Sequence, residues 1–163
     1  FRFPIQDIYN MNGKKVAVGG IISGKIRKGE KVNILPLNKE CRVKEIKTFK
    51  KNKHMANAPE SVGLILDRMD NLDRGQVICK PRLPVVATEI SANIFCVLPL
   101  DIKENLQFRC STQEAPCQII QMAQVWDTAS LEAKPKKGVL EKNDFIPNPK
   151  KMELFYLVSL INL

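Results

Sequence analysis

The stretch from Gly19 to Pro36 constrains the fold more than any other part of this sequence. It reads Gly-Gly-Ile-Ile-Ser-Gly-Lys-Ile-Arg-Lys-Gly-Glu-Lys-Val-Asn-Ile-Leu-Pro, with short apolar runs separated by two breaks. Glycine tolerates the positive φ that a tight turn requires, so Ser23-Gly24 and Lys28-Gly29-Glu30 are predicted turns. Two turns this close together leave no room for a helix. The stretch therefore predicts a curling β-meander, and small curled sheets tend to close into barrels.

The rest of the chain extends this pattern to two domains. Its 163 residues suit one larger domain or two small ones, and a hydrophobic content of 44% is enough for packed cores. No ten-residue segment shows sustained helical periodicity. The linker Lys80-Pro-Arg-Leu-Pro84 contains two prolines, which block continued strand pairing. We therefore predict an all-β chain of two tandem antiparallel β-barrels, over residues 1–81 and 85–163, with an atypical C-terminal part.

Apolar alternation predicts the strands of the first barrel. Phe1–Tyr9 reads as a first strand, and Asn12-Gly13 is a strong hairpin signal. The segment Cys41–Phe49 also reads as a strand, but its apolar period is imperfect. An imperfect period indicates a bulge or a change in the direction that side chains face.

Three further strands are predicted in the second barrel, one of them over Leu106–Cys110. Ile90–Leu98 has the cleanest alternation in the sequence, and Cys117–Trp126 follows as another strand. We expect the large aromatic side chains of Phe95 and Trp126 in the core. The segment Lys134–Gly138 is predicted to be a basic, proline-containing loop.

Basic residues are concentrated near the start of the chain. Residues 14–54 hold 13 of the 26 Lys and Arg residues and only three acids, which leaves a net charge of +10 on a chain of total charge +9. Such a face attracts polyanions such as nucleic acid, nucleotides or an acidic protein, although a solvated strand face has the same composition. The candidate partner or polyanion surface comprises Lys28, Lys44, Lys47, Lys50, Lys51, Lys53 and His54.

No pattern in the sequence predicts catalysis or metal binding. The cysteines are odd in number, and no Cys-x-x-Cys pair occurs among them. We expect these residues to be buried and inert: Cys41, Cys79, Cys96, Cys110 and Cys117. The one histidine, His54, has no neighbouring nucleophile or metal ligand and is expected in a surface loop. We therefore predict no catalytic, cofactor-binding or metal-binding residue in this stretch of protein.

Several motifs resemble a known family. The pattern Gly-x-Ile-x-Ser-Gly-x-Ile-x-x-Gly-x-x-Val-x-x-x-Pro of Gly19–Pro36 is similar to the second domain of translation-factor GTPases, a small β-barrel in elongation factors Tu and 1-alpha. The similarity extends to Phe1–Tyr9, Ala58–Gly63 and Leu72–Ile78. In the second half, Ala92–Phe95, Leu106–Glu114 and Trp126–Glu132 resemble the third domain of the GTPase subunit of sulfate adenylyltransferase. The resemblance spans roughly residues 1–145.

The resemblance also shows what this stretch lacks. No Gly-x-x-x-x-Gly-Lys-[Ser/Thr] phosphate loop occurs, so the N-terminal GTPase domain of the family, with its GTP and Mg²⁺, is expected outside this sequence. The chain begins in a predicted strand, without Met or a signal peptide, which favours a fragment of a longer protein. After Phe145, Ile146-Pro-Asn-Pro149 interrupts the expected continuation, and Leu154–Leu163 has little likeness to the family.

The resemblance implies a coupling role in the cytoplasm. The family enzyme uses GTP hydrolysis to drive the formation of adenosine 5′-phosphosulfate from ATP and sulfate, and a separate catalytic subunit transfers the adenylyl group. The two barrels would then link the GTPase domain to that subunit, without chemistry of their own and without a membrane. The alternative is an elongation-factor module that binds aminoacyl-tRNA, partly near the loop of residues 49–59, whose lysines suit phosphate contacts.

Overall fold

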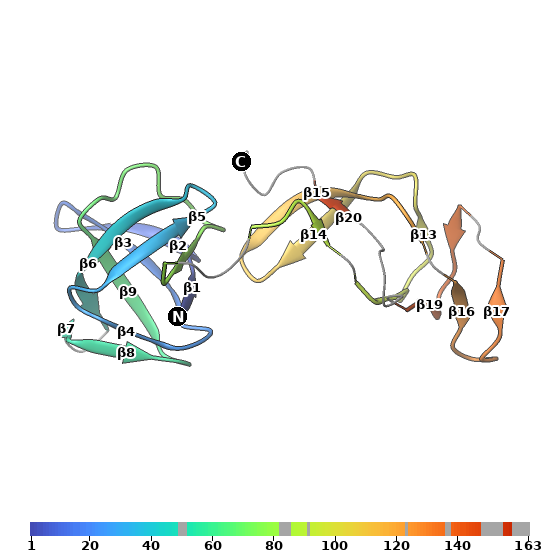
Figure 1. The fold of residues 1–163 in the computed structure, drawn as a ribbon, viewed down its shortest axis with the longest axis horizontal. Coiled ribbons are helices and arrows are strands. Elements are labelled where there is room, and N and C mark those ends of the chain that lie inside the picture. Colours follow the sequence, from blue (N-terminus) through green and yellow to red (C-terminus); the bar gives the residue numbers. More distant parts are fainter. Residues whose placement is uncertain are drawn as a thin grey trace. The chain divides into compact units, whose positions relative to one another are not determined.

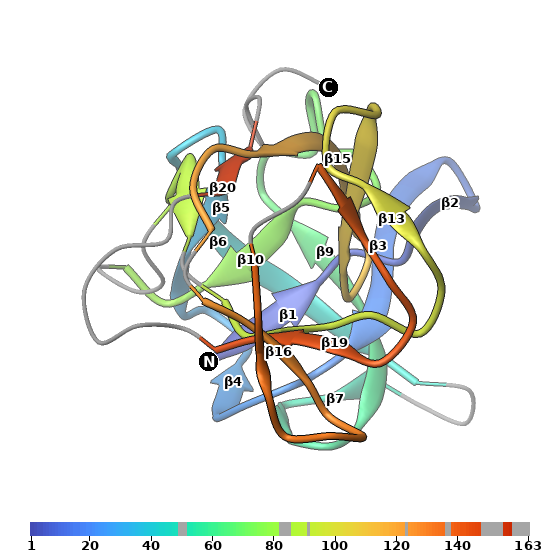
Figure 2. The same ribbon diagram turned by 90° about the vertical axis from the view of Figure 1, so that its right-hand side faces the viewer.

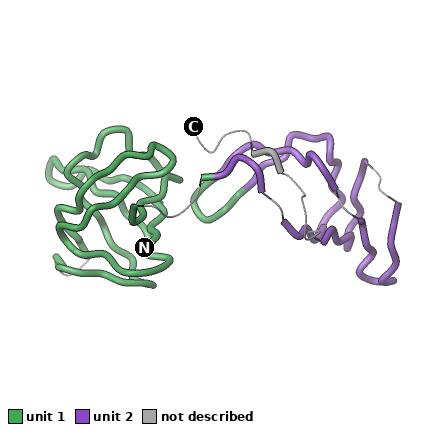
Figure 3. The backbone as a smooth tube through the Cα atoms, viewed as in Figure 1, with its two compact units in different colours: residues 1–86, 109–113 green, residues 87–108, 114–163 purple. Residues whose placement is uncertain are grey.

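A computed structural model describes residues 1–48, 52–81, 86–90, 92–122, 124–135 and 138–147, and the backbone of residues 155–157. Strands and turns form this part of the chain, with no helix in it (Figures 1 and 2). The prediction of an all-β protein is confirmed. The chain divides into two compact units, residues 1–86 with 109–113 and residues 87–108 with 114–163 (Figure 3). Residues 82–85, in the predicted linker, lie outside the described residues.

Unit 1 contains the curled sheet that the meander predicts. Its strands are β1 (Arg2–Pro4), β2 (Asp7–Met11), β3 (Lys14–Gly20), β4 (Lys25–Arg27), β5 (Lys31–Leu35), β6 (Lys39–Lys47), β7 (Asn52–Lys53), β8 (Met55–Asn57), β9 (Ser61–Leu66) and β10 (Val77–Cys79). The main sheet has the order β1-β10-β5-β6-β9-β3-β2, with β7 paired to β6, and β4 and β8 form a separate ribbon. All of these pairs are antiparallel.

The two ends of the main sheet meet through the backbone. The N–H of Gln6 donates to the carbonyl of Val18 (2.8 Å), and the N–H of Ile22 donates to the carbonyl of Arg2 (2.9 Å). These bonds join the segment around β1 to β3 and its continuation, at the opposite end of the strand order. The sheet therefore curls around its apolar side chains, as small barrels do.

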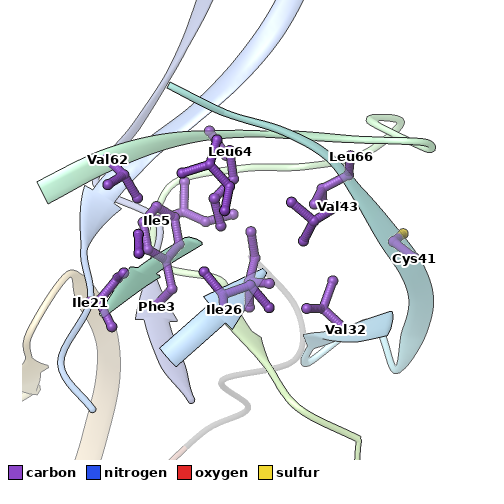
Figure 4. Close-up of a cluster of buried hydrophobic side chains, with 14 of the residues drawn as sticks. Phe3, Ile5, Ile21, Ile26, Val32, Cys41, Val43, Val62, Leu64 and Leu66 are labelled. Atoms are coloured by element: carbon purple, nitrogen blue, oxygen red, sulfur yellow. The ribbon is translucent and has the colours of Figure 1, made fainter. Parts of the chain in front are cut away.

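The core of unit 1 comes from residues that alternate along these strands. Figure 4 shows the buried side chains converging from opposite walls of the curled sheet. The cluster comprises Phe3, Ile5, Ala17, Ile21, Ile26, Val32, Ile34, Cys41, Val43, Ile46, Ala56, Val62, Leu64, Leu66 and Ile78. Burial of these apolar groups is the main force that stabilises the unit.

The glycines within Gly19–Pro36 have two separate roles. Gly24 has a φ of +75°, in the region that favours glycine, and it lies in the predicted turn before β4. Gly19 instead allows a close approach, because a Cβ built there would lie 2.3 Å from the carbonyl oxygen of Pro4. The first glycine thus sets a turn, and the second lets two strands cross closely.

The bulge predicted in Cys41–Phe49 is confirmed. Between β6 and β9 the register shifts from Val43 opposite Leu66 to Glu45 opposite Ile65. Lys44 is the extra residue and is exposed, while Val43 and Ile46 on either side are buried. Phe49, at the end of the predicted strand, lies outside the described residues.

The prediction of one continuous first strand over Phe1–Tyr9 is wrong. The structure has two strands, β1 and β2, with Ile5 and Gln6 between them. The chain changes partner at this point, since the N–H of Ile5 donates to the carbonyl of Gln76 (2.8 Å) while that of Gln6 donates to Val18. Alternation of apolar residues continues through this change and therefore hides it.

Unit 2 consists of short strands in small sheets. They are β11 (Glu89–Ile90), β12 (Ile94–Phe95), β13 (Leu100–Asp101), β14 (Leu106–Cys110), β15 (Gln113–Ile119), β16 (Val125–Asp127), β17 (Ala133–Lys134), β18 (Val139–Leu140), β19 (Asp144–Ile146) and β20 (Phe155–Leu157). Part of the β14–β15 hairpin, residues 109–113, clusters with unit 1. The sheet orders are β11-β20-β15-β14, β12-β19-β16-β17 and β13-β18.

The core of unit 2 differs from the prediction. It contains Cys96, Val125, Leu140 and Ile146, with partly buried apolar side chains around them. Phe95 and Trp126, expected in the core, are 52% and 40% exposed. Strand alternation gives two faces but does not say which one is buried, and here Ile94 and Val125 face the core instead.

Two predicted strands of unit 2 are also shorter than expected. Among the described residues of Ile90–Leu98, strand structure is limited to Ile90, which ends β11, and to Ile94–Phe95, which form β12. The predicted strand Cys117–Trp126 divides between β15 and β16. The cysteine prediction holds for Cys41, Cys79 and Cys96, which are buried, and burial raises the pKa of each thiol. It is wrong for Cys110, which is exposed on β14.

Candidate functional site

The predicted basic residues lie in neighbouring parts of unit 1. Lys28 follows β4, Lys44 and Lys47 are on β6, Lys53 ends β7, and His54 lies between β7 and β8. The remaining two, Lys50 and Lys51, are outside the described residues. We refer to Lys28, Lys44, Lys47, Lys53 and His54 as the basic surface.

Backbone pairing brings most of these residues together. Ile46 is opposite Lys53 and Lys47 is opposite Asn52 in the β6–β7 pair. The N–H of Lys28 donates to the carbonyl of His54 (2.9 Å), which ties the turn after β4 to the end of β7. Lys47 and Lys53 are thus held by regular strand pairing, Lys28 and His54 are joined by one backbone hydrogen bond, and Lys44 is the extra residue of the bulge.

Glu45 is a counter-ion within this surface that the sequence prediction missed. Its carboxylate lies 2.8 Å from Lys14 Nζ and 3.8 Å from Lys47 Nζ. The hydrogen bond from Lys14 lowers the pKa of Glu45, and the charges of Lys14, Lys47 and Lys28 lower it further. Two lysines, from β3 and β6, thus contact one carboxylate.

Lys53 is neutralised by a second carboxylate. Its ammonium pairs with Glu60 Oε2, while Glu60 Oε1 accepts a hydrogen bond from the N–H of Asn57 (3.1 Å). The bond from Lys53 is the main cause of a lowered pKa at Glu60. Within the part of the chain that the structure describes, Lys28, Lys44 and His54 have no carboxylate within ion-pair distance.

The β4–β8 ribbon extends the positive charge. Lys25 and Arg27 are exposed on β4, on either side of the buried Ile26, and Arg27 precedes Lys28 in the chain. They are opposite Asn57 and Met55 of β8. The sequence prediction omitted both residues, although alternation around Ile26 is a signal that could have found them.

The arrangement suits binding of an anion. Exposed ammonium and guanidinium groups attract phosphate or carboxylate. Among the described residues, His, Cys, Asp and Glu side chains do not gather in the groups of three that could hold a metal ion. Nor do these residues include a helix long and apolar enough to cross a membrane.

A second polar cluster lies in unit 2, around Lys134. Its Nζ lies 2.9 Å from Asp127 Oδ2, 2.9 Å from Asp144 Oδ1 and 3.2 Å from Glu141 Oε2. The sequence predicts Lys134 in a loop, which is wrong, because it ends β17 and pairs with Val125. The ammonium of lysine has three N–H donors, and each of the three carboxylates accepts one hydrogen bond from it.

The electrostatics of this cluster follow from those contacts. The bond from Lys134, with the N–H groups of Ala129 and Ser130, lowers the pKa of Asp127 to about 2. Bonds to Asp144, Asp127 and Glu141 raise the pKa of Lys134.

Asp144 is buried. Burial acts to raise its pKa, but the bonds from Lys134 and the Glu141 N–H lower it overall. A cavity of ≈ 160 Å³ beside the cluster is lined by Val125, Lys134, Pro135, Val139, Leu140, Glu141 and Asp144. Because the buried carboxylate is fully paired, we read the cluster as structural.

Comparison with known proteins identifies the barrel. The family model described as "Elongation factor Tu domain 2" matches residues 14–79, the stretch that carries the basic surface. Residues 14–79 are an elongation factor Tu domain 2 region. Over the 81–88% of its length that curated relatives match, the chain corresponds to domains 2 and 3 of a translation-factor-type GTPase.

These relatives fall into two groups. Sulfate adenylyltransferase subunit 1 of Alteromonas mediterranea is 28% identical over 136 residues, which are 81% of this chain and 29% of that protein. The corresponding protein of Bacteroides fragilis is 32% identical over 136 residues. Elongation factor 1-alpha of Methanosphaerula palustris is 30% identical over 151 residues, which are 88% of this chain and 35% of that protein. The chain thus spans about a third of the length of the curated relatives it matches.

Solved structures agree on the fold. The structure of sup35 complexed with GDP matches with a TM-score of 0.80 at 17% identity, over 98% of this chain and 39% of that one. A bacterial selenocysteine-specific elongation factor matches with a TM-score of 0.68 at 18% identity, over 97% of this chain and 23% of that one. At this identity the likeness concerns the fold, and it confirms the predicted resemblance to domains 2 and 3.

Proposed function

We propose that this chain is the barrel region of the GTPase subunit of a GTP-dependent sulfate adenylyltransferase. The observation that carries the proposal is the similarity to sulfate adenylyltransferase subunit 1 over 136 residues, more than unit 1 alone contains. In this role the two barrels couple the GTPase domain to the catalytic subunit that forms adenosine 5′-phosphosulfate from ATP and sulfate, in the cytoplasm. GTP and Mg²⁺ would be bound by the GTPase domain.

The contribution of this chain would be docking. Rigid barrels transmit a nucleotide-dependent change by moving as bodies against a switch domain, which requires surfaces but no catalytic group. The basic surface, with Lys28 and Lys44 exposed and without ion pairs among the described residues, supplies one such surface. An acidic region of the catalytic subunit would be its complement.

A second candidate is an elongation-factor module that binds aminoacyl-tRNA. The specific observation in its favour is the match to elongation factor 1-alpha, which extends over 151 residues and 88% of this chain. The basic surface also suits the phosphates of RNA, whose neutralisation supplies most non-specific affinity. Lys50 and Lys51, predicted from the sequence, would add two more phosphate contacts.

A direct binding comparison distinguishes the two candidates. The purified chain is presented separately with the catalytic subunit of a bacterial sulfate adenylyltransferase and with aminoacyl-tRNA, at physiological salt. Saturable binding to the subunit, lost in the double variant Lys28→Glu/Lys44→Glu, is the expected result. Binding to aminoacyl-tRNA that is lost in Lys50→Glu/Lys51→Glu, without binding to the subunit, would replace the first proposal with the second.

A further inference from the structure

The tip of the β2–β3 hairpin is the one place in the sequence where an asparagine precedes a glycine, at Asn12-Gly13. Met11 is opposite Lys14 in the strand pair, so these two residues alone connect the strands. Their φ angles are +52° and +77°, which is the left-handed combination of a type I′ turn. The hairpin that the sequence predicts at Asn12-Gly13 is therefore confirmed.

The reactive atoms of this turn are open to water. Asn12 and Gly13 are both exposed, as are Met11 and Lys14 beside them. A Cβ built on Gly13 would have no heavy atom within 4 Å. Within the described part of the chain, the Gly13 N–H donates no backbone hydrogen bond. Solvent therefore reaches both the side-chain amide of Asn12 and the backbone nitrogen of Gly13.

We propose that Asn12 is a site of spontaneous deamidation in the folded chain, which converts it to aspartate and isoaspartate. The backbone nitrogen of Gly13 loses its proton to hydroxide and attacks Cγ of Asn12. A C–N bond forms, the bond between Cγ and Nδ2 breaks, and the amide nitrogen leaves as ammonia. Water then opens the five-membered succinimide at either of its carbonyl carbons. Overall, one water is consumed and one ammonia is released, without oxidation or reduction.

The following residue makes Asn12 more reactive than the other asparagines. A side chain on that residue crowds the attacking nitrogen, and every asparagine except Asn12 precedes a residue that has one. The next two residues, Lys14 and Lys15, are both cationic. Positive charge nearby stabilises the nitrogen anion that attacks, so it favours the loss of the Gly13 amide proton.

The turn must open before the ring can close. Ring closure requires the Asn12 ψ to rotate until the Gly13 nitrogen lies beside the Asn12 side chain, far from the ψ of about +30° in a type I′ turn. The turn lies beyond the paired strands, and β2 is the last strand in the order of the main sheet. Opening at such a tip costs less than unfolding of the barrel. We therefore expect the folded chain to react, but more slowly than the unfolded chain.

The products change the charge and the geometry of the hairpin. A carboxylate replaces a neutral amide, which lowers the formal net charge by one from +9. The new charge lies two residues from Lys14, whose ammonium already pairs with Glu45 at 2.8 Å. Isoaspartate also adds a methylene group to the main chain, which a two-residue type I′ turn does not accommodate. The isoaspartate product should therefore loosen the pairing of β2 with β3.

Incubation of the purified chain in mildly alkaline buffer at about 37 °C tests the proposal. Mass spectrometry of tryptic peptides should show a gain of about one mass unit in the peptide of residues 3–14, and fragmentation should place it at Asn12 and not at Asn10. Labelling with isoaspartyl methyltransferase should detect the isoaspartate product. Asn12 should react at least about tenfold faster than any other asparagine.

Asn71 is a matched control within the same chain. It is exposed and has a φ of +59°, close to that of Asn12, but it precedes Leu72. Asn71 should stay intact while Asn12 reacts. The variant Gly13→Ala should slow the reaction at Asn12 at least about tenfold, and circular dichroism checks that it folds. If the left-handed φ of Gly13 prevents this variant from folding, the comparison of Asn12 with Asn71 in the wild type still decides.

Three results would overturn the proposal. Loss of another asparagine before Asn12 would show that the hairpin tip is not the preferred site. Reaction of Asn12 only in about 6 M guanidinium chloride, and not in the folded chain, would show that the turn protects it fully. Equal rates in the folded and the denatured chain would show that opening of the turn does not control the reaction.

Discussion

The ammonium of Lys53 pairs with the carboxylate of Glu60, which is itself held by the backbone N–H of Asn57 (3.1 Å). One lysine of the basic surface is therefore already neutralised. By contrast, Lys28 and Lys44 have no ion-pair partner among the described residues. The value of a lysine for anion binding depends on this difference, which the sequence does not reveal.

The first prediction compares these lysines. Lys28→Glu and Lys44→Glu should each weaken binding of a polyanion such as heparin or tRNA several-fold at physiological salt, because each reverses an uncompensated charge. Lys53→Gln should have a smaller effect, because the Lys53 ammonium is already paired with Glu60 and is less available to a phosphate. Affinity measured over a salt series checks this, and the salt slope should become shallower for the first two variants. Equal effects at all three positions would contradict it.

Glu45 gives the second prediction. Its carboxylate holds Lys14 and Lys47 at 2.8 and 3.8 Å, so Glu45→Gln should free two lysines and remove one repulsive charge. Polyanion affinity should rise about two- to tenfold at low salt and by less at high salt. Because the lowered pKa of Glu45 keeps it ionised near neutrality, the effect should persist throughout pH 6–8. A variant that binds polyanions no better than the wild type would show that Glu45 does not limit the surface.

The close approach at Gly19 gives the third prediction. Gly19→Ala should destabilise unit 1 by at least about 2 kcal/mol, because its Cβ would lie 2.3 Å from the carbonyl oxygen of Pro4 and the backbone must shift. Gly20→Ala is the matched control, since the nearest atom to its Cβ is Ser61 Oγ at 3.9 Å. Urea unfolding of both variants checks the contrast. Similar losses of unfolding free energy at the two positions would show that packing against Pro4 does not require glycine at position 19.

Most of unit 1 could be predicted from the sequence. Its turns at Gly24 and Gly29, its bulge at Lys44 and its alternating core all leave local signals, because glycine, loss of period and alternation are properties of neighbouring residues. The ion pairs Lys53–Glu60 and Lys14–Glu45 leave no local signal in the sequence. Those contacts depend on which strands become neighbours, so the site could be located to a surface but not resolved into free and paired lysines.

Unit 2 was harder to predict for a related reason. Its strands are short, and the sequence favours a core position for Phe95 and Trp126 because large aromatic residues are usually buried. The register places both on the outer face, opposite Phe145. A strand pattern gives two faces, and only the packing of several strands decides which one is covered. Lys134 shows the same limit, since its three carboxylates come from residues seven to ten positions away that only the fold brings together.

The Lys134 cluster gives the last prediction, a loss of stability in acid. Asp127 has a pKa lowered from 3.8 to about 2 in the folded chain, so its contribution is present above pH 3.8 and is lost as the pH falls toward 2. Asp144, whose pKa is also lowered, should act in the same direction.

Lys134→Met should lower the melting temperature of unit 2 by roughly 5 °C at neutral pH, because it leaves the buried Asp144 carboxylate without its ammonium partner. The variant should also lose stability less steeply between pH 4 and pH 2 than the wild type, since the pKa of Asp127 would return toward its ordinary value. Thermal unfolding followed by near-ultraviolet circular dichroism of Trp126, on β16 beside Lys134, reports on this unit. Parallel pH profiles for the variant and the wild type would show that the ion pairs do not link pH to the stability of the sheet, and would leave Lys134 as a packing residue.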